Sequence, residues 1–325
     1  MNPALPPRLA AAADALLEGV SRKNLAGHAA ALSGHYRQGH GSAVAVGEDQ
    51  DALAYLVARL PATYAVAASV LAQLRDAVPD FAPASLLDAG AGPGTASWAA
   101  LEIWPALAKI AMTDSNPRFL ALARLLAAGQ ETLSRADFIA ADLGHAGALA
   151  RAELVIASFV LAEIAQTAQA RLVEKLFAAT RDVLVLVEPG TPAGFARIRD
   201  ARTQLIGQGV QVLGPCTHAN ACPMIAPDWC HFSQRLPRSR AHMQAKGGRV
   251  PYEDERYSWL AVSRTRRSAF AGAARVLAPP EDSKPGIALK LCTPDGLENR
   301  FVARRDKNGF AALRKTGWGG VVPAR

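Results

Sequence analysis

The chain has 325 residues, half of them hydrophobic and a fifth charged, a composition typical of a soluble globular protein with a buried core. No apolar run approaches the roughly 18 residues that a membrane span needs. Asp14 and Glu18 interrupt the apolar amino-terminal stretch, which resembles neither a secretory signal nor an organellar transit peptide. We therefore expect a cytoplasmic, monomeric protein without membrane contact, whose four cysteines are reduced or bound to metal.

Charge is distributed unevenly along the chain. Residues 1–230 carry 17 Lys and Arg against 20 Asp and Glu, whereas residues 231–325 carry 19 against 8, a net charge of +11. A basic region of this kind indicates a polyanionic partner, of which nucleic acid is the commonest. The alternative is a basic surface that is only solvated.

The first 83 residues form a predicted helical region. Pro61 is compatible with the first turn of a helix, where the missing N–H has no intrahelical partner to lose. Glycines and histidines break the apolar pattern over residues 28–47, which predicts a loop. Apolar residues recur at helical spacing in three stretches, residues 10–20, 51–60 and 64–78.

The next segment has the pattern D-x-G-x-G-x-G, in which Asp88 follows a short apolar run and precedes Gly90, Gly92 and Gly94. Glycine permits positive φ and close approach of a ligand, and the N-terminus of the following helix favours an anionic group. This spacing is typical of S-adenosylmethionine sites, whereas dinucleotide sites use G-x-G-x-x-G. Asp88 would then face the methionine ammonium, and the turn would face the methionine carboxylate. The alternative is a glycine-rich turn in another kind of α/β domain.

Strands and helices alternate beyond this turn, which predicts a parallel sheet covered on both faces. Asp114 follows the second predicted strand, where an acidic side chain can accept hydrogen bonds from both ribose hydroxyls of an adenosine cofactor. Asp142 follows the third strand, where it would either contact the adenine amino group or cap a helix. The predicted strands after the first are residues 108–113, 138–141, 154–158, 183–187 and 257–263.

The end of the fourth predicted strand usually lies beneath the reactive sulfonium in methyl transfer. Here it leads into Phe159-Val-Leu-Ala-Glu163, which is neither the Asn/Asp-Pro-Pro-aromatic of amine methylation nor the cysteine nucleophile of pyrimidine-carbon methylation. Glu163 is either a polar contact to substrate or an exposed helix glutamate. No catalytic residue can be assigned.

Three of the cysteines lie within fifteen residues. Cys216, Cys222 and Cys230 form a C-x5-C-x7-C array, and Cys292 lies in a predicted hairpin of residues 287–292 and 300–304. Four thiolates suit tetrahedral zinc or an iron–sulfur cluster, and the wide spacing favours the cluster, with a structural role. His218 and His231 are alternative zinc ligands, and unliganded thiols are the remaining alternative.

Arginines and aromatic residues alternate after the cysteine array. Guanidinium groups bind phosphates and aromatic faces stack on unpaired bases, so this region predicts an RNA-binding surface. The residues concerned are Arg235, Arg238, Arg240, Lys246, Arg249, Arg264, Arg266 and Arg267, together with Trp229, Phe232 and Tyr252.

With these segments identified, the chain resembles the methyltransferase-like family of the small ribosomal subunit assembly factor of mitochondria and bacteria. The most specific matching segment is Gly214-Pro-Cys…Cys-Pro-Met…Asp-Trp-Cys-His-Phe232; the others are residues 86–95, 187–192, 292–296 and 304–319. The resemblance implies a Rossmann-like, seven-stranded S-adenosylmethionine methyltransferase fold and association with small-subunit ribosomal RNA. It also implies a 4Fe-4S cluster with Cys216, Cys222, Cys230 and Cys292 as ligands.

The domain organisation predicted on this basis is a helical region, residues 1–83, and a methyltransferase-like domain, residues 84–325. Within that domain, residues 214–250 are a cysteine-rich, metal-binding insertion, and residues 287–325 are a hairpin with a basic tail. The amino terminus predicts a bacterial, cytoplasmic member of the family.

Two functional hypotheses follow. The first is a methyltransferase acting on small-subunit ribosomal RNA, in which catalysis consists mainly of aligning a base with the cofactor methyl group. The second is a non-catalytic assembly factor that binds ribosomal RNA and keeps the cofactor as a structural ligand. A nicotinamide dehydrogenase is a third, which the glycine spacing opposes.

Overall fold

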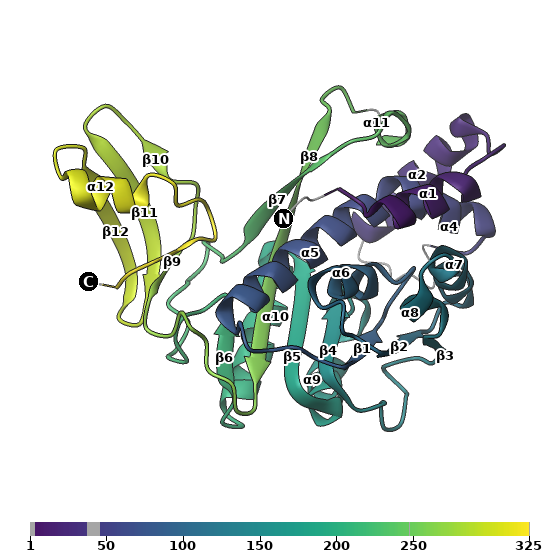
Figure 1. Ribbon diagram of the computed structural model, residues 1–325, viewed down its shortest axis with the longest axis horizontal. Helices are drawn as coiled ribbons and strands as arrows, with labels where there is room; N and C mark the ends of the chain where they lie inside the picture. Colours follow the sequence, from purple (N-terminus) through teal and green to yellow (C-terminus); the bar gives the residue numbers. More distant parts are fainter. Residues whose placement is uncertain (1–3, 38–45, 247, 325) are drawn as a thin grey trace.

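The structure, a computed structural model, describes residues 4–37, 46–246 and 248–324. Five parallel strands form one side of its main sheet, from the edge strand inward, in the order β3-β2-β1-β4-β5 (Figure 1). Each coincides with a strand predicted from the apolar pattern, which confirms the expected α/β architecture. Their bounds are β1 Ser85–Ala89, β2 Lys109–Asp114, β3 Asp137–Ala140, β4 Ala152–Ser158 and β5 Thr180–Pro189.

The sheet has eight strands, so the prediction of seven was wrong. Strand β8 (Tyr252–Ser263) lies antiparallel between β5 and β6 (Gln211–Gly214). Because β8 is 12 residues long, its first half extends beyond β6 and pairs with β7 (Phe232–Pro237). Strand β8 therefore places an antiparallel strand directly beside the five parallel ones.

Alternate residues of the strands enter two separate cores. Leu86 of β1 packs into the core on one face, and Leu87 packs into the core on the other. Helices α5 (Leu60–Ala77), α6 (Thr95–Ile103) and α7 (Pro117–Ala127) cover the first face, and α9 (Gln166–Ala179) and α10 (Pro192–Ile206) cover the second. The sheet is therefore the middle of three layers (Figure 1).

The amino-terminal region is helical, as predicted, and consists of α1 (Pro7–Leu16), α2 (Arg22–Arg37), α4 (Asp49–Ala58) and α5. Helix α2 replaces the first part of the predicted loop, because Leu25, Ala29 and Leu32 are buried on one face of it. The next eight residues of that loop lie outside the described residues. Among the described residues, no single helix is long and apolar enough to cross a membrane. Helices α4 and α5 reach the necessary length and apolar composition only when taken together, and they are bent by 53°.

A second, five-stranded sheet follows the main one in the chain and lies beside it (Figure 1). Strands β11 (Gly286–Thr293) and β12 (Gly296–Ala303) form the predicted hairpin. Residues 215–231, which carry three cysteines, connect β6 to β7 and pack between the two sheets. The remaining elements are α8 Glu131–Ser134, the 3-10 helix η1 Leu161–Glu163, α11 Arg240–Lys246, β9 Ala274–Val276, β10 Glu281–Asp282, α12 Lys307–Leu313 and β13 Val321–Val322.

Candidate functional site

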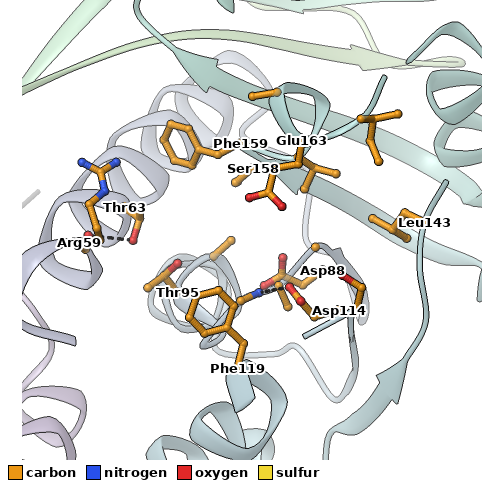
Figure 2. Close-up of a pocket in the computed structure, with 18 of the residues that line it drawn as sticks. Arg59, Thr63, Asp88, Thr95, Asp114, Phe119, Leu143, Ser158, Phe159 and Glu163 are labelled. Carbon is orange, nitrogen blue, oxygen red and sulfur yellow. Dashed lines mark hydrogen bonds between the residues drawn. The ribbon is translucent and has the colours of Figure 1, made fainter. Parts of the chain in front are cut away.

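A pocket of about 190 Å³ opens at the carboxyl ends of β1, β2 and β4. Ligands of open α/β sheets bind at this edge, where the strand order reverses. The three predicted acids, Asp88, Asp114 and Asp142, all line it, as do Gly90 and Gly92. Figure 2 shows Asp88 and Asp114 on one side of the pocket, with Phe159, Ser158 and Glu163 on another.

The three glycines of the turn have different structural roles. All three have positive φ, 73° for Gly90, 53° for Gly92 and 83° for Gly94. A Cβ on Gly90 would overlap the Cγ2 of Val160, whereas a Cβ on Gly92 would meet only Phe119, at 3.9 Å. Gly94 caps α6 and packs against β2, since a Cβ there would lie 3.1 Å from the Sδ of Met112. Gly94 does not line the pocket itself.

Asp88 is almost completely buried at the end of β1. Its Oδ2 accepts hydrogen bonds from the backbone N of Ser97 at 3.0 Å and from the Ser97 hydroxyl at 2.8 Å. Burial raises the pKa of Asp88 to about 6, and the bonds from Ser97 oppose that shift. The carboxylate therefore connects the strand to the start of α6.

The raised pKa of Asp88 predicts a pH-dependent stability. Its protonated form is favoured in the folded state, so its contribution is complete below about pH 4 and is lost as pH rises through about 6. In cofactor-free protein we expect Asp88→Asn to raise the free energy of unfolding at pH 8 by up to about 3 kcal/mol, with little change at pH 4. Urea unfolding at the two pH values measures this.

Asp142→Asn is the matched control, because the pKa of exposed Asp142 is lowered by its hydrogen bond with His145. Its substitution should not stabilise the protein at pH 8. A gain for Asp88→Asn that is the same at both pH values would contradict the assignment.

Asp114 lies on the same side of the pocket as Asp88 (Figure 2) and holds the glycine turn. Its Oδ2 accepts from the backbone N of Gly92 and its Oδ1 from that of Asn116, both at 2.8 Å. Burial raises its pKa, and these bonds counteract the shift. Asp142 lies near the surface, where its Oδ1 accepts from the backbone N of Gly144 at 2.8 Å, so it caps a turn while also lining the pocket.

The end of β4 carries the most unusual backbone of the site. Phe159 has φ 64°, the single positive value outside glycine among the described residues. Such strain is often found at functional sites. The neighbouring Ser158 hydroxyl has no hydrogen-bond partner within the described part of the chain. Glu163 lines the pocket and is therefore placed to contact a bound molecule.

Four lining residues from α4, α5, the junction between them and α7 were not predicted from the sequence, because no motif marks them. Tyr55 comes from α4, Thr63 from α5 and Arg59 from the junction between them, all in the predicted helical region. Glu188 lies behind the pocket at the end of β5, where Arg197 donates to its Oε2 at 2.6 Å. Burial raises the pKa of Glu188 to about 7, although the charge of Arg197 opposes the shift. Phe119 of α7 is the fourth of the lining residues that were not predicted.

The four cysteines come together in a second, mostly apolar cavity of about 30 Å³. Cys292 reaches it from β11 and the others from residues 215–231, with the Nε2 of His218 3.4 Å from the Cys292 Sγ. Burial, together with the neighbouring Cys216 and Cys222, raises the pKa of the Cys292 thiol to about 12. His231 lies outside this cavity, stacked on Trp229 at 5.0 Å between ring centroids.

The described part of the chain does not show the metal site that was predicted for the cysteine-rich insertion. Within the described residues, no three His, Cys, Asp or Glu side chains are arranged to hold a metal ion as they stand. The thiols are free and line the cavity together with apolar side chains.

The arginines after the cysteine array are less available than their sequence predicts. Arg235 pairs with Asp254 at 2.8 Å and Arg238 with Glu253 at 3.3 Å, and Arg266 pairs with two aspartates. Phe232 is buried in the core, so it cannot stack on a base. The partly exposed ring of Tyr252 is covered by the Arg235 guanidinium, 4.1 Å from its centroid.

Comparison with known proteins gives a family match over residues 49–323, to the model described as "Mitochondrial small ribosomal subunit Rsm22". The human protein "Ribosome assembly protein METTL17, mitochondrial" is 28% identical over 83% of this chain and 62% of its own length. "Rsm22-cox11 tandem protein 2, mitochondrial" of Schizosaccharomyces pombe is 23% identical over 85% of this chain and 43% of its own. The chain thus spans less than two thirds of either relative.

Solved methyltransferase structures are also similar. Magnesium protoporphyrin IX methyltransferase from Synechocystis, with bound S-adenosylmethionine, is 18% identical over 71% of this chain and 90% of its own, with a TM-score of 0.40. The N-methyltransferase NodS from Bradyrhizobium japonicum is 12% identical over 61% of this chain and 86% of its own, with a TM-score of 0.40.

The family match corrects one expectation. A cytoplasmic location, inferred from the amino-terminal composition, is contradicted because the family and the two relatives above are described as mitochondrial. The composition of that segment is therefore no guide to location here. The chain belongs to the Rsm22 family of mitochondrial small ribosomal subunit proteins.

Proposed function

We propose that the protein binds S-adenosylmethionine and acts on small-subunit ribosomal RNA during ribosome assembly. The observation that carries the cofactor assignment is the convergence of the glycine turn and all three predicted acids on one pocket. Asp88 would bind the methionine ammonium, and the start of α6 the carboxylate. Asp114 would accept from the ribose hydroxyls, and Asp142 would contact the adenine amino group.

The ribosomal role is supported by the family description and by the name of the human relative, a ribosome assembly protein. Contact with RNA phosphates is supported by basic residues on α12 and immediately before and after it. Their side chains are exposed, and no ion pair of the described residues involves them. They are Arg305, Lys307, Arg314 and Lys315.

Methyl transfer would take place where the end of β4 meets the cofactor pocket. Phe159 and Ser158 form this part of the wall, and Glu163 is an acceptor for a proton released from a methylated base. The enzyme would contribute mainly by holding the base in line with the methyl group.

A non-catalytic assembly factor is the second candidate. The observation in its favour is the sequence Ser158-Phe159-Val160 at the end of β4, which carries neither a Pro-Pro-aromatic motif nor a cysteine. In this case the cofactor would be a structural ligand of the same pocket.

We also propose that the four cysteines hold a structural 4Fe-4S cluster, with zinc as the alternative. The donor set fits, because four soft sulfur ligands line one cavity. The wide C-x5-C-x7-C spacing favours the cluster over one zinc ion. Anaerobically purified protein that is brown and absorbs at about 400 nm would support the cluster. Colourless protein with one zinc ion per chain would contradict it.

The test of catalysis uses labelled S-adenosylmethionine and immature small subunits from cells that lack the protein. An enzyme should transfer label to one ribosomal RNA nucleotide, and Asp88→Ala should abolish both transfer and cofactor binding. Glu131→Ala, on exposed α8, is the matched control and should change neither. If the protein binds cofactor and RNA but transfers no label, and if subunit maturation is intact in Asp88→Ala, the protein is instead the assembly factor.

A further inference from the structure

Two buried arginines lie beside the cysteine cavity. Arg202 of α10 and Arg275 of β9 are each only 4% exposed. A guanidinium group stays protonated at any physiological pH. Although burial lowers the pKa of Arg275 to about 10, this residue is also charged at neutral pH. The protein therefore places two positive charges in its interior.

The hydrogen bonds of these arginines go to neutral carbonyl groups. Arg202 Nη2 donates to the carbonyl oxygens of His218 at 2.9 Å and Asn220 at 2.8 Å, and its Nε has no partner in the described part of the chain. Arg275 donates to the carbonyl oxygens of Pro215 and Gly319, both at 2.6 Å. No carboxylate of the described residues forms an ion pair with either arginine. A buried charge without a counter-charge is costly.

The ionisable groups nearest to these charges are the thiols. Arg202 lines the cysteine cavity together with all four thiols. Arg275 is the partner of Cys292 in the pairing of β9 with β11, and its Nε donates to the carbonyl oxygen of Pro215, next to Cys216. The phenol of Tyr257, whose pKa is raised by burial, also interacts with Arg275. Neutral thiols and a neutral phenol cannot balance two guanidinium groups.

Metal binding changes this balance. Four thiolates around a core of twofold positive charge, either a zinc ion or an oxidised four-iron cluster, carry a twofold negative net charge. We propose that Arg202 and Arg275 are the counter-cations of such a tetrathiolate centre, so that the loaded centre and its two arginines are together neutral. This inference rests on the proposed function of the four cysteines and adds two positioning residues, one on each side of the junction between the sheets.

The alternative is that the arginines only fasten the loop through its carbonyl groups. Substitution by lysine and by glutamine separates the two roles. Lysine keeps the positive charge but loses the planar set of guanidinium donors, whereas glutamine loses the charge. If charge is what matters, Arg202→Lys and Arg275→Lys should load nearly as well as wild type, whereas Arg202→Gln and Arg275→Gln should not.

The experiment measures iron, acid-labile sulfide and zinc per chain in anaerobically purified protein, together with the apparent affinity in a chelator titration. The glutamine variants should bind the metal about 10- to 100-fold more weakly, the range for residues that support metal ligands. A loaded iron cluster that remains should have a more negative reduction potential. Arg300→Gln is the matched control, because Arg300 is 7% exposed but is already paired with Glu298.

A second measurement keeps the inference testable if a glutamine variant folds poorly. In a chain with all four cysteines replaced by serine, the arginines have no counter-charge, so Arg202→Met with Arg275→Met should raise the urea midpoint. The same pair of substitutions should lower the midpoint of the loaded protein.

The outcomes distinguish this inference from the function on which it rests. Wild-type protein that binds neither iron with sulfide nor zinc would overturn both. Three results would overturn only the role of the arginines. They are normal metal content in the glutamine variants, an equal loss of metal in the lysine and glutamine variants, and a stability change of the same sign in both backgrounds.

Discussion

Replacing Cys230 or Cys292 with serine is expected to release the second sheet while leaving the cofactor pocket intact. Cys292 belongs to β11 of the second sheet, whereas Cys230 and the other two belong to the segment that leaves the main sheet. A centre bound to all four would therefore join the two sheets, and a structural metal centre contributes its binding energy to folding. We expect a loss of about 4 kcal/mol or more, the range typical of losing a metal site.

The remaining contacts between the sheets explain why the loss should be local. Few buried apolar side chains pack there, chiefly Phe195, Met224 and Leu277 beside Cys292. Limited proteolysis should cut between residues 264 and 324 in the variants, while S-adenosylmethionine binding persists. Met224→Leu in the same cluster conserves volume and should cost less than about 1.5 kcal/mol. Resistance to proteolysis equal to that of wild type would contradict a joining role.

Replacing Gly90 with alanine is expected to disable the cofactor turn. The positive φ of Gly90 costs about 1–2 kcal/mol for an L-residue, and overlap of the new Cβ with Val160 adds the cost of overpacking, about 1–3 kcal/mol. Relief of the overlap must move either the turn or the end of β4, and both line the pocket. Affinity for S-adenosylmethionine should fall about tenfold or more, since about 1.4 kcal/mol is a factor of ten.

Two glycines of the same chain are controls for this prediction. Gly19 has φ 75° with no atom near its absent Cβ, so Gly19→Ala measures strain alone and should not affect the cofactor. Gly92→Ala adds a methyl group with free space around it, in the same turn. Urea unfolding and calorimetric cofactor titration should rank Gly90→Ala as the most damaging of the three. Equal effects for Gly90→Ala and Gly19→Ala would show that Val160 does not limit the position of the turn.

The central strands and the cofactor turn could be predicted from the sequence because they depend on local patterns. A continuous apolar run before Asp88 requires a buried strand, and closely spaced glycines require a turn, whatever lies elsewhere in the chain. The acids at the strand ends could be predicted to meet, because parallel strands bring their carboxyl ends to one edge. Their individual contacts with the cofactor remain predictions.

The short strands β6 and β7 could not be predicted, because each is specified by pairing with β8 and not by its own pattern. The same holds for Arg59 and Tyr55, which reach the pocket only because α4 and α5 pack over that end of the sheet. Helix α2 is different, since the spacing of Leu25, Ala29 and Leu32 carried a usable signal that the neighbouring glycines obscured.

By itself, then, the sequence determined the position of the glycine turn, the acids that follow three of the strands, and the cysteine spacing. Only the tertiary structure decided which charges are exposed. The arginines of the basic third read alike in sequence, yet Arg235 is paired at the surface, whereas Arg275 is buried beside thiols. Burial and ion pairing depend on residues distant in the chain, and the free energy of a charge depends mainly on these surroundings.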